Sequence, residues 1–303
     1  MARMGISHYI KDIGRGKDGA RALGRAQAAD LMGLILDQQV SDLELGAFCL
    51  AMRIKGETAE EMAGFLDATH ARLHKVHTGQ APTVVLPSYN GARKLPVLTA
   101  LLALLLARDG VAVVVHGTAT EDKRVSSQAV LSELGICASD SSPEVKAGEV
   151  VFVPTGALNP GLERLLSVRR VVGLRNPGHS LVKLMNPFAS DKALVVSSYT
   201  HPEYLQSMSA TFALTGQHAL LLRGTEGEPV ADARRTPAMD VFNQGQTRRV
   251  QNPQEGALAQ VPDLPGTDAV ATAAYIQRVL RGELPVPQPI TLQVQHILRE
   301  VKP

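Results

Sequence analysis

TVVLPSYNGARKLPVLTALLALLLARDGVAVVV, residues 83–115, predicts a strand, a loop, a helix and a second strand in succession. The β-branched run TVVL occupies 83–86, an apolar helical segment covers 95–108, and VAVVV follows at 111–115. Two short apolar strands joined by a helix are typical of neighbouring parallel strands in a sheet that helices cover.

The same alternation continues toward the C-terminus. It predicts a helix around 127–134, strands at 149–153, 193–198 and 218–222, and helices at 203–214 and 269–280. Residues 224–268 are rich in Gly, Pro and polar residues, so we expect them to run over the surface before a short final helix. The fold class is therefore α/β, with a mainly parallel sheet covered by helices over residues 79–303.

The N-terminal part has a different texture. The first 75 residues show apolar residues at helical spacing and no strand pattern. Ser41 is suited to cap a helix, and Glu44 three residues later completes the capping-box pattern. We predict a small all-helical domain over 1–78. A helical segment from later in the chain is the alternative source of a further helix for this domain.

Composition places the chain among ordinary globular proteins. It has 303 residues, 45% hydrophobic and 20% charged, with no Trp and 4% aromatic residues. Cys49 and Cys137 predict two buried free thiols in a reducing cytoplasm. We expect no signal peptide and no membrane segment, because the most apolar run, 95–107, is too short to span a bilayer.

The net charge of +2 is distributed unevenly. Residues 1–30 hold six basic and three acidic residues, 151–190 hold five and one, and 234–249 hold four and one, whereas 37–67 hold two basic and seven acidic. Such a distribution is compatible with a basic face for a polyanion. The alternative is solvated surface charge without a partner.

LPSYNGARK at 86–94 lies between the first strand and its helix, where many enzymes keep a phosphate-binding loop. Those loops usually hold several glycines, which let backbone N–H groups approach the phosphate, but this loop has only Gly91. Arg93 and Lys94 precede the predicted helix, so the positive end of its dipole should add to their charge.

DLELGAFCLAMRIKGETAEEMAGFL at 42–66 resembles the helical N-terminal domain of anthranilate phosphoribosyltransferase, in glycosyltransferase family 3. His116–Gly117, Arg175 and Asn186–Pro187 fall where that family has its own His-Gly, Arg and Asn-Pro elements. The resemblance covers roughly residues 20–230. It implies the nucleoside phosphorylase/phosphoribosyltransferase class II fold and a homodimer formed through the helical domain.

The resemblance also shows what this sequence lacks. The family's Gly-Thr-Gly-Gly-Asp loop corresponds to residues 87–91, where Pro87 has no N–H and Tyr89 adds bulk. The family's magnesium-binding Asp-Glu pair corresponds to Pro229 and Val230, which offer no oxygen side chain. Glu226, Glu228 and Asp232 are nearby substitutes. We predict no catalytic residue, no metal and no cofactor.

A vestigial cleft is expected where the family binds its substrates. Arg175 matches the arginine that contacts the acceptor carboxylate in the enzymes. Either these residues now serve the structure alone, or the interdomain cleft still binds a small anion. The candidate residues are Tyr89, Asn90, Gly91, His116, Gly117 and Arg175.

Three further stretches, IKDIGRGKDGARAL at 10–23, SYNGARK at 88–94 and RGTEGEPVAD at 223–232, look like the YbiB-type paralogues of the family. That resemblance implies a homodimer that binds DNA without marked sequence preference, with RNA as the alternative polyanion. No sequence-reading DNA motif is visible. The candidate phosphate contacts are Arg15, Lys17, Arg93, Lys94, Lys183, Arg234, Arg235, Arg248 and Arg249.

Three hypotheses follow. The first is a nucleic-acid-binding dimer on a retired transferase scaffold. The second is a glycosyl or phosphoribosyl transferase, or a phosphorylase, with altered substrate handling, which the remodelled loop disfavours. The third is a small-ligand-binding protein without turnover.

Overall fold

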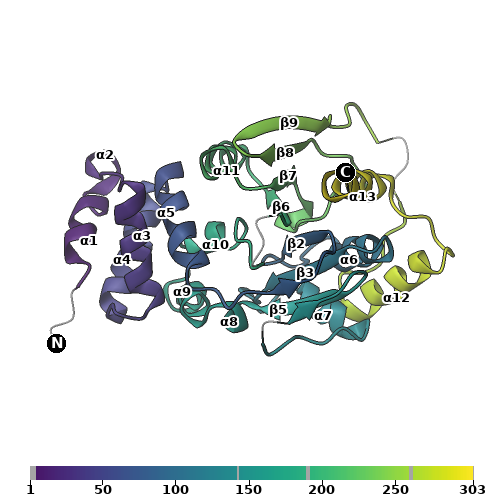
Figure 1. Ribbon diagram of the computed structural model, residues 1–303, viewed down its shortest axis with the longest axis horizontal. Helices are drawn as coiled ribbons and strands as arrows, with labels where there is room; N and C mark the ends of the chain where they lie inside the picture. The colour runs from purple at the N-terminus through teal and green to yellow at the C-terminus, as the bar shows by residue number, and fades with distance from the viewer. Residues whose placement is uncertain (1–4, 142, 189–191, 259–261, 303) are drawn as a thin grey trace.

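The computed structural model describes residues 5–141, 143–188, 192–258 and 262–302, apart from the side chain of Lys17. A helical bundle lies at one end of an elongated molecule and an α/β unit at the other (Figure 1). The bundle consists of α1 (Ser7–Ile13), α2 (Gly16–Gly19), α3 (Arg25–Leu36), α4 (Asp42–Lys55) and α5 (Ala59–His70).

The α/β unit is built on a seven-stranded sheet with the order β5-β3-β2-β6-β7-β8-β9. The first five strands in this order are parallel, and β8 and β9 add an antiparallel hairpin. A separate small parallel pair joins β1 (His77–Thr78) to β4 (Glu144–Val145). The strands of the large sheet are β2 (Thr83–Pro87), β3 (Ala112–Gly117), β5 (Val150–Pro154), β6 (Leu194–Tyr199), β7 (Ala219–Arg223), β8 (Met239–Asn243) and β9 (Gln246–Gln251).

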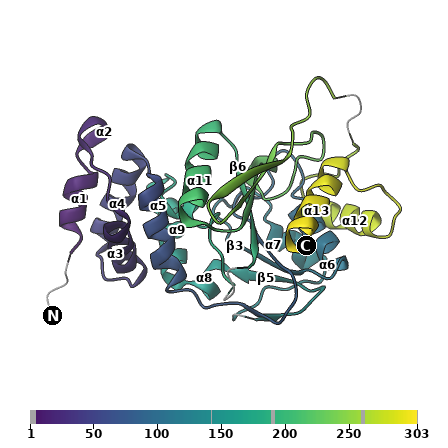
Figure 2. The ribbon, with the colours of Figure 1, turned by 45° about the horizontal axis from the view of Figure 1, so that its top comes forward.

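Helices cover both faces of this sheet. Figure 2 shows α9 and α11 between the bundle and the sheet, with α6, α12 and α13 on the opposite side. Successive strand residues point to opposite faces, so Val85 packs toward the bundle while Val84 and Leu86 pack toward the outer helices. The covering helices are α6 (Thr99–Arg108), α7 (Ser127–Glu133), α8 (Thr155–Leu158), α9 (Pro160–Val172), α10 (Gly178–Leu181), α11 (Pro202–Thr215), α12 (Ala269–Leu280) and α13 (Gln288–Val301).

The predicted capping box at the start of α4 is confirmed. The Glu44 backbone N–H donates to Ser41 Oγ, and the Ser41 backbone N–H donates to the Glu44 carboxylate at 2.9 Å. The helix ends at Lys55, and the next residue, Gly56, has a φ of 81°, a conformation that favours glycine.

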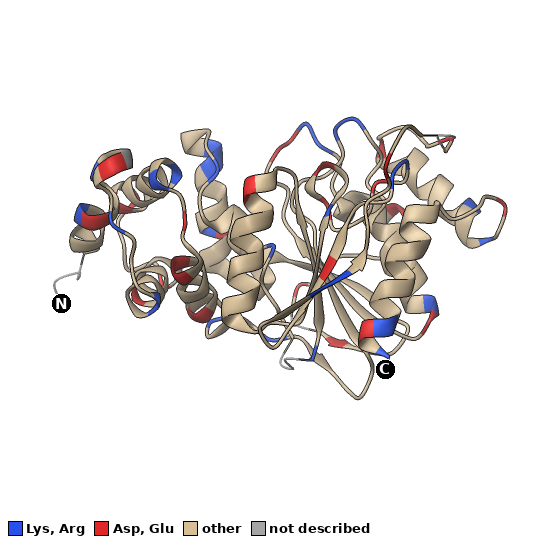
Figure 3. Ribbon diagram, turned by 90° about the horizontal axis from the view of Figure 1, so that it is seen from above, with Lys and Arg blue, Asp and Glu red and all other residues tan. Residues whose placement is uncertain are grey.

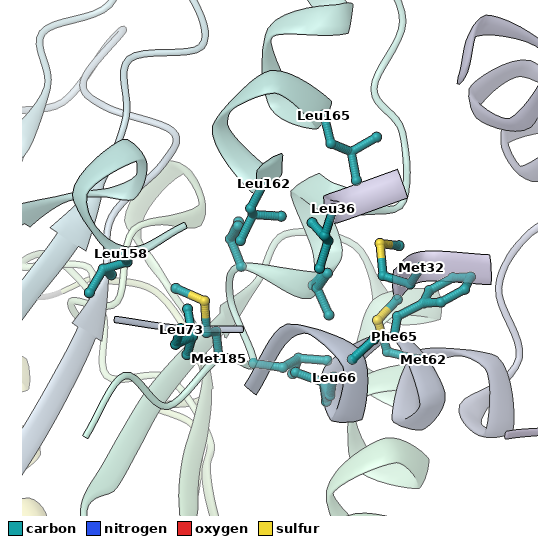
Figure 4. Close-up of a cluster of buried hydrophobic side chains, with 14 of the residues drawn as sticks. Met32, Leu36, Met62, Phe65, Leu66, Leu73, Leu158, Leu162, Leu165 and Met185 are labelled. Carbon is teal, nitrogen blue, oxygen red and sulfur yellow. The ribbon is translucent and has the colours of Figure 1, made fainter. Parts of the chain in front are cut away.

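The bundle and the α/β unit share one hydrophobic core. Figure 4 shows Met32 and Leu36 of α3 in a cluster with Leu162 and Leu165 of α9. Close approach of the two parts needs Gly161, because a Cβ there would lie 2.0 Å from the Leu36 carbonyl oxygen. This shared core holds the bundle and the α/β unit in place relative to each other.

Several expectations about individual segments were wrong. Residues 224–268 do not simply run over the surface, because 239–251 form the β8–β9 hairpin. The helix expected from residue 95 begins at Thr99, and the final helix has 14 residues. Cys49 is a buried free thiol as expected, whereas the free thiol Cys137 is exposed.

Among the helices of the described residues, none combines the length and apolar character that crossing a bilayer requires.

Candidate functional site

The candidate site lies beyond the C-terminal ends of the parallel strands. The chain moves from β2 outward through β3 to β5, then returns to the other side of β2 with β6 and β7. Such a reversal of direction opens a crevice at the C-terminal edge, where α/β folds commonly bind ligands. The loops after β2, β3, β6 and β7 meet there.

Tyr89 points into the protein rather than into the cleft. Its hydroxyl lies 2.8 Å from His116 Nδ1 and 2.9 Å from Thr155 Oγ1. Burial raises the pKa of Tyr89 and lowers the pKa of His116 to about 3, so His116 is neutral at physiological pH. These two residues, predicted for the vestigial cleft, instead anchor the loop on the core.

The backbone N–H groups of the loop are occupied by a carboxylate of the protein itself. Glu228 is 1% exposed, and its Oε1 accepts hydrogen bonds from the backbone N–H groups of Asn90 at 2.7 Å and Gly91 at 2.8 Å. Its Oε2 accepts from the hydroxyls of Ser88, Ser127 and Thr99. The donors that a pyrophosphate needs are therefore already satisfied.

Glu226 fills the next part of the loop in the same way. Its Oε2 accepts from the backbone N–H groups of Arg93 at 2.7 Å, Lys94 at 3.0 Å and Leu95 at 3.3 Å. Burial raises the pKa of Glu226, but these N–H groups outweigh it and leave the pKa below its usual range. Glu226 adopts a φ of 52°, which places its side chain over the loop.

Two glycines permit this close packing. Gly91 has a φ of 71°, and a Cβ there would lie 2.6 Å from the Val125 carbonyl oxygen. At Gly117 a Cβ would lie 1.9 Å from the carbonyl oxygen of Ser88. Because neither glycine has a side chain, the loop can pack closely against β3 and the β3–α7 connection. Asn90 Nδ2 also donates a hydrogen bond to the Glu226 carbonyl oxygen.

The residues do not fit the magnesium pyrophosphate that active phosphoribosyltransferases use. Val230 is buried, and Pro229 has no side-chain oxygen. The carboxylates of Glu226 and Glu228 face N–H and hydroxyl donors, which leaves them poorly placed for a hard cation. Within the described ranges, no group of three or more His, Cys, Asp or Glu side chains could hold a metal ion.

A cavity of about 320 Å³ lies between the bundle and the sheet. Arg175 lines it beside His179 and Lys183, facing Met52 and Met62 of the bundle. A charged and an apolar wall together suit a small ligand with an anionic group.

Lys183 was predicted to contact nucleic acid, and its position argues against this. Its Nζ donates to the carbonyl oxygens of Gly227 at 2.9 Å and Ser198 at 3.4 Å, beneath the loop. Burial lowers its pKa to about 8. Its amine is tied to backbone carbonyls at the wall of the cavity and not presented on the outer surface, so Lys183 supports the segment that carries Glu226 and Glu228.

The depressed pKa of Lys183 predicts a pH dependence of stability. The folded state releases this proton near pH 8 and the unfolded state near its ordinary value of 10.5, so the unfolded state binds more protons between them. The free energy of unfolding should therefore rise across this window, by up to about 3 kcal/mol from this group. Lys183→Met should remove that rise in urea titrations from pH 7.5 to 10. An identical pH profile in both proteins would contradict the assignment.

Arg93 and Lys94 lie at the exposed edge of the loop. Within the described part of the chain, neither side chain has an ion-pair partner. Because α6 begins at Thr99, its dipole does not start at Lys94, contrary to the sequence expectation. Figure 3 shows Lys and Arg segments along this edge, on the loops above the sheet and on the adjoining helical part, interspersed with Asp and Glu segments.

The remaining basic candidates are dispersed and mostly neutralised. Arg248 pairs with Glu300 at 2.7 Å, and Arg235 donates to the backbone carbonyls of Gln254 and Gly256. Arg15 lies on the bundle and donates to the Lys11 carbonyl, and the side chain of Lys17 is outside the described part. Two more arginines form bidentate pairs, Arg234 with Asp232 and Arg249 with Asp240.

Sequence reasoning missed the role of Glu226 and Glu228, which it considered only as substitute metal ligands. A signal was present, since two acidic residues flank Gly227 just before Pro229 and Val230, the positions that correspond to the family's acidic pair. Also missed was Glu121 after β3, which lies among three arginines, Arg124, Arg169 and Arg175.

The comparisons with known proteins agree with the fold. Residues 7–72 match the helical bundle domain of the glycosyl transferase family. The chain is 40% identical to YbiB of Escherichia coli K12 over 298 residues, which covers 96% of this chain and 92% of YbiB. It is 29% identical to anthranilate phosphoribosyltransferase of Anaeromyxobacter dehalogenans over 286 residues, 92% and 83% of the two chains.

Solved structures show the same fold at lower identity. Anthranilate phosphoribosyltransferase from Thermus thermophilus gives a TM-score of 0.74 at 21% identity, over 97% of this chain and 88% of that one. The Saccharomyces cerevisiae enzyme in complex with PRPP and Mg gives 0.67 at 15% identity, over 98% and 86%.

Proposed function

We propose that this chain, which belongs to the family of YbiB and the anthranilate phosphoribosyltransferases, binds nucleic acid as a homodimer without sequence preference and does not transfer phosphoribosyl groups. The observation that carries the proposal is the loop after β2. Its backbone N–H groups are bound by Glu226 and Glu228, while Arg93 and Lys94 remain exposed beside them.

Occupation of the loop argues against transfer. A pyrophosphate would have to displace Glu228 from its two backbone N–H groups, or lie against its carboxylate. Both are costly, because like charges repel strongly where water is excluded and buried donors need a partner. Because Pro229 and Val230 offer a metal no oxygen ligand and the N–H groups are occupied, a leaving pyrophosphate would lack the electrostatic stabilisation that this chemistry needs.

The same edge suits a polyanion on the outside. Arg93 and Lys94 project from a backbone that Glu226 fixes in place, so their charges are presented from a rigid support. Arg234 is already held by Asp232, whose carboxylate raises the pKa of the guanidinium, so the charge of this edge comes from Arg93 and Lys94. Nonspecific binding needs phosphate contacts of this kind and no base-reading element.

Exposed apolar side chains support a homodimer. Leu43, Leu50 and Ile54 of α4 are 84%, 47% and 54% exposed. Val171 at the end of α9 is 89% exposed, and Leu174 just beyond it is 42% exposed. The two helices are tied by the Arg164–Asp42 ion pair at 2.7 Å. Large apolar residues gathered on adjoining elements commonly mark an interface, and a two-fold dimer would double every basic cluster.

A salt titration tests the proposal. We expect the protein to bind a 30-base single strand and a duplex of unrelated sequence with a Kd of about 1 µM or lower in 50 mM salt. The logarithm of affinity should fall linearly with the logarithm of salt concentration, because phosphate contacts release counterions. Fluorescence anisotropy measures both quantities. Weak binding at low salt, or affinity that salt does not change, would overturn the proposal.

A transferase with altered substrate handling is the second candidate, and the cavity beside Arg175 favours it. Isothermal titration with phosphoribosyl pyrophosphate and magnesium separates the two. We expect no metal-dependent heat of binding, whereas tight metal-dependent binding would favour the transferase.

A further inference from the structure

In the ion pairs of the described residues, Glu121 meets more arginines than any other carboxylate. Among the ion pairs of the described residues, most carboxylates meet a single cation, and Glu283 meets two arginines. Glu121 meets three. Its distances are 2.7 Å to Arg169 Nη2, 3.1 Å to Arg124 Nε and 3.6 Å to Arg175 Nη2. We call these four residues the Glu121 cluster.

The Glu121 cluster joins three separate segments at the C-terminal edge of the sheet. Glu121 and Arg124 lie in the β3–α7 connection, Arg169 in the last turn of α9, and Arg175 in the segment after it. Arg175 also lines the large cavity, and Glu121 and Arg124 line a small hollow beside Gly91. The cluster therefore lies between the loop after β2 and the cleft, partly open to solvent.

Its charges are not balanced. Three guanidinium groups around one carboxylate leave a surplus of two positive charges, and their side chains are only 15%, 18% and 36% exposed. Arg170 pairs with Asp122 at the rim, and Lys123 beside it is exposed. Like charges held together with reduced hydration favour an added anion. Guanidinium groups match the oxygen pairs of a phosphate particularly well.

We propose that the Glu121 cluster binds a phosphate group, and that Glu121 holds the three guanidinium groups in position until the phosphate takes over part of their hydrogen bonding. The inference rests on the proposed function for its main source of phosphate, the phosphodiester backbone of a bound strand. A free inorganic phosphate or pyrophosphate has the same chemistry and is the other source.

Glu121→Gln gives the sharpest test. The substitution keeps size and shape but removes the competing negative charge, so the affinity for a single-stranded oligonucleotide at 100 mM salt should rise about fivefold. A purely structural role for Glu121 predicts the opposite, because loss of its ion pairs would loosen the loop without creating a better anion site. Unchanged or weaker binding by a variant that melts like the wild type would overturn the inference.

Arg124→Gln with Arg169→Gln gives the complementary test. The double variant has two fewer arginines for phosphate, so its salt dependence should be flatter, by about 0.7 to 0.9 in slope for each phosphate that is no longer neutralised. The matched control is Arg25→Gln with Arg281→Gln, which removes two arginines that pair with Asp67 and Glu283 elsewhere. The contrary result is that the wild type binds the oligonucleotide normally while the Arg124/Arg169 variant shows the same salt dependence as the Arg25/Arg281 control. That result would overturn the phosphate site at the Glu121 cluster and leave the proposed function standing.

Titration with inorganic pyrophosphate separates the two sources. Displacement of the oligonucleotide by pyrophosphate in the wild type, reduced in the Arg124/Arg169 variant, would support the cluster. If the wild type binds no oligonucleotide, the proposed function fails, and calorimetry with pyrophosphate alone decides on the cluster. Pyrophosphate binding that depends on Arg124 and Arg169 would then support it, and no binding would overturn it.

Discussion

Replacing Glu228 with alanine should lower the free energy of unfolding by about 3–5 kcal/mol, as expected when one partner of a buried charged network is removed. The two backbone N–H groups and three hydroxyls that donate to its carboxylate would lose their acceptor in a place where Glu228 is 1% exposed. Each buried donor left without a partner costs about 1–3 kcal/mol, and entering water recovers part of this. Lys183 would lose its nearest favourable charge as well.

Two variants set the scale for this prediction. Glu228→Gln keeps an oxygen for the backbone N–H groups of Asn90 and Gly91, and its NH₂ can donate to the hydroxyls, so it should cost about 1–2 kcal/mol. Glu226→Ala opens donors that water can reach and should cost about 1 kcal/mol. Urea unfolding followed by circular dichroism measures all three. If Glu228→Ala is no less stable than Glu226→Ala, the carboxylate is not the support of the loop.

The sheet was predictable because its central strands carry the signal in their own residues. Thr83–Pro87 and Ala112–Gly117 are buried throughout, and such strands have the continuous apolar runs typical of parallel sheets. The cap at Ser41 was predictable for a similar reason, since all of its partners lie within three residues. Local patterns of this kind depend little on the rest of the chain.

The β8–β9 hairpin was missed because its outer strand has no apolar pattern. Gln246–Gln251 is the edge strand and is mostly exposed, with Arg248 and Arg249 along it. Charged edge strands prevent pairing between sheets of different molecules, so the polar sequence suits the position. The available signal was Gln244–Gly245, where both residues have positive φ, 49° and 78°, as a two-residue hairpin turn requires.

The candidate site was predictable only in part, because its decisive contacts join residues far apart in the sequence. The loss of glycines and of the metal ligands could be inferred from residues 87–91 and 229–230 alone. The sequence could not show that Glu228 binds the backbone N–H groups of the loop, because Glu228 lies 138 positions from Asn90. Lys183 was misjudged for the same reason, since its neighbours in the sequence do not show that backbone carbonyls elsewhere in the chain, those of Ser198 and Gly227, accept its hydrogen bonds.

Replacing both Arg93 and Lys94 with glutamate should weaken binding to a single-stranded oligonucleotide by about 30- to 100-fold at 100 mM salt, without unfolding the protein. Each chain would exchange two positive charges for two negative ones at an exposed edge. The fold should tolerate the change, because Glu226 is bound by the backbone N–H groups of these residues and not by their side chains.

The control for this variant reverses two charges at the other edge of the sheet. Lys146 precedes β5, and Arg299 lies in the last turn of α13, whose end contacts the residue following α6 through the Lys302–Asp109 bond. Both are exposed, so Lys146→Glu with Arg299→Glu makes the same change in net charge away from the loop. Anisotropy titrations of the two variants, with light scattering to check that each keeps the oligomeric state of the wild type, give the comparison.

Equal loss of affinity in both variants would mean that net charge, rather than the loop, governs binding. Unchanged affinity in the Arg93/Lys94 variant would place the contact surface elsewhere, first on the segment that carries Arg234 and Arg249 or on the basic residues of the bundle. A selective loss at Arg93 and Lys94 would mean that the loop after β2 still attracts phosphate. Its side chains would then do so from outside, while Glu226 and Glu228 occupy its backbone N–H groups.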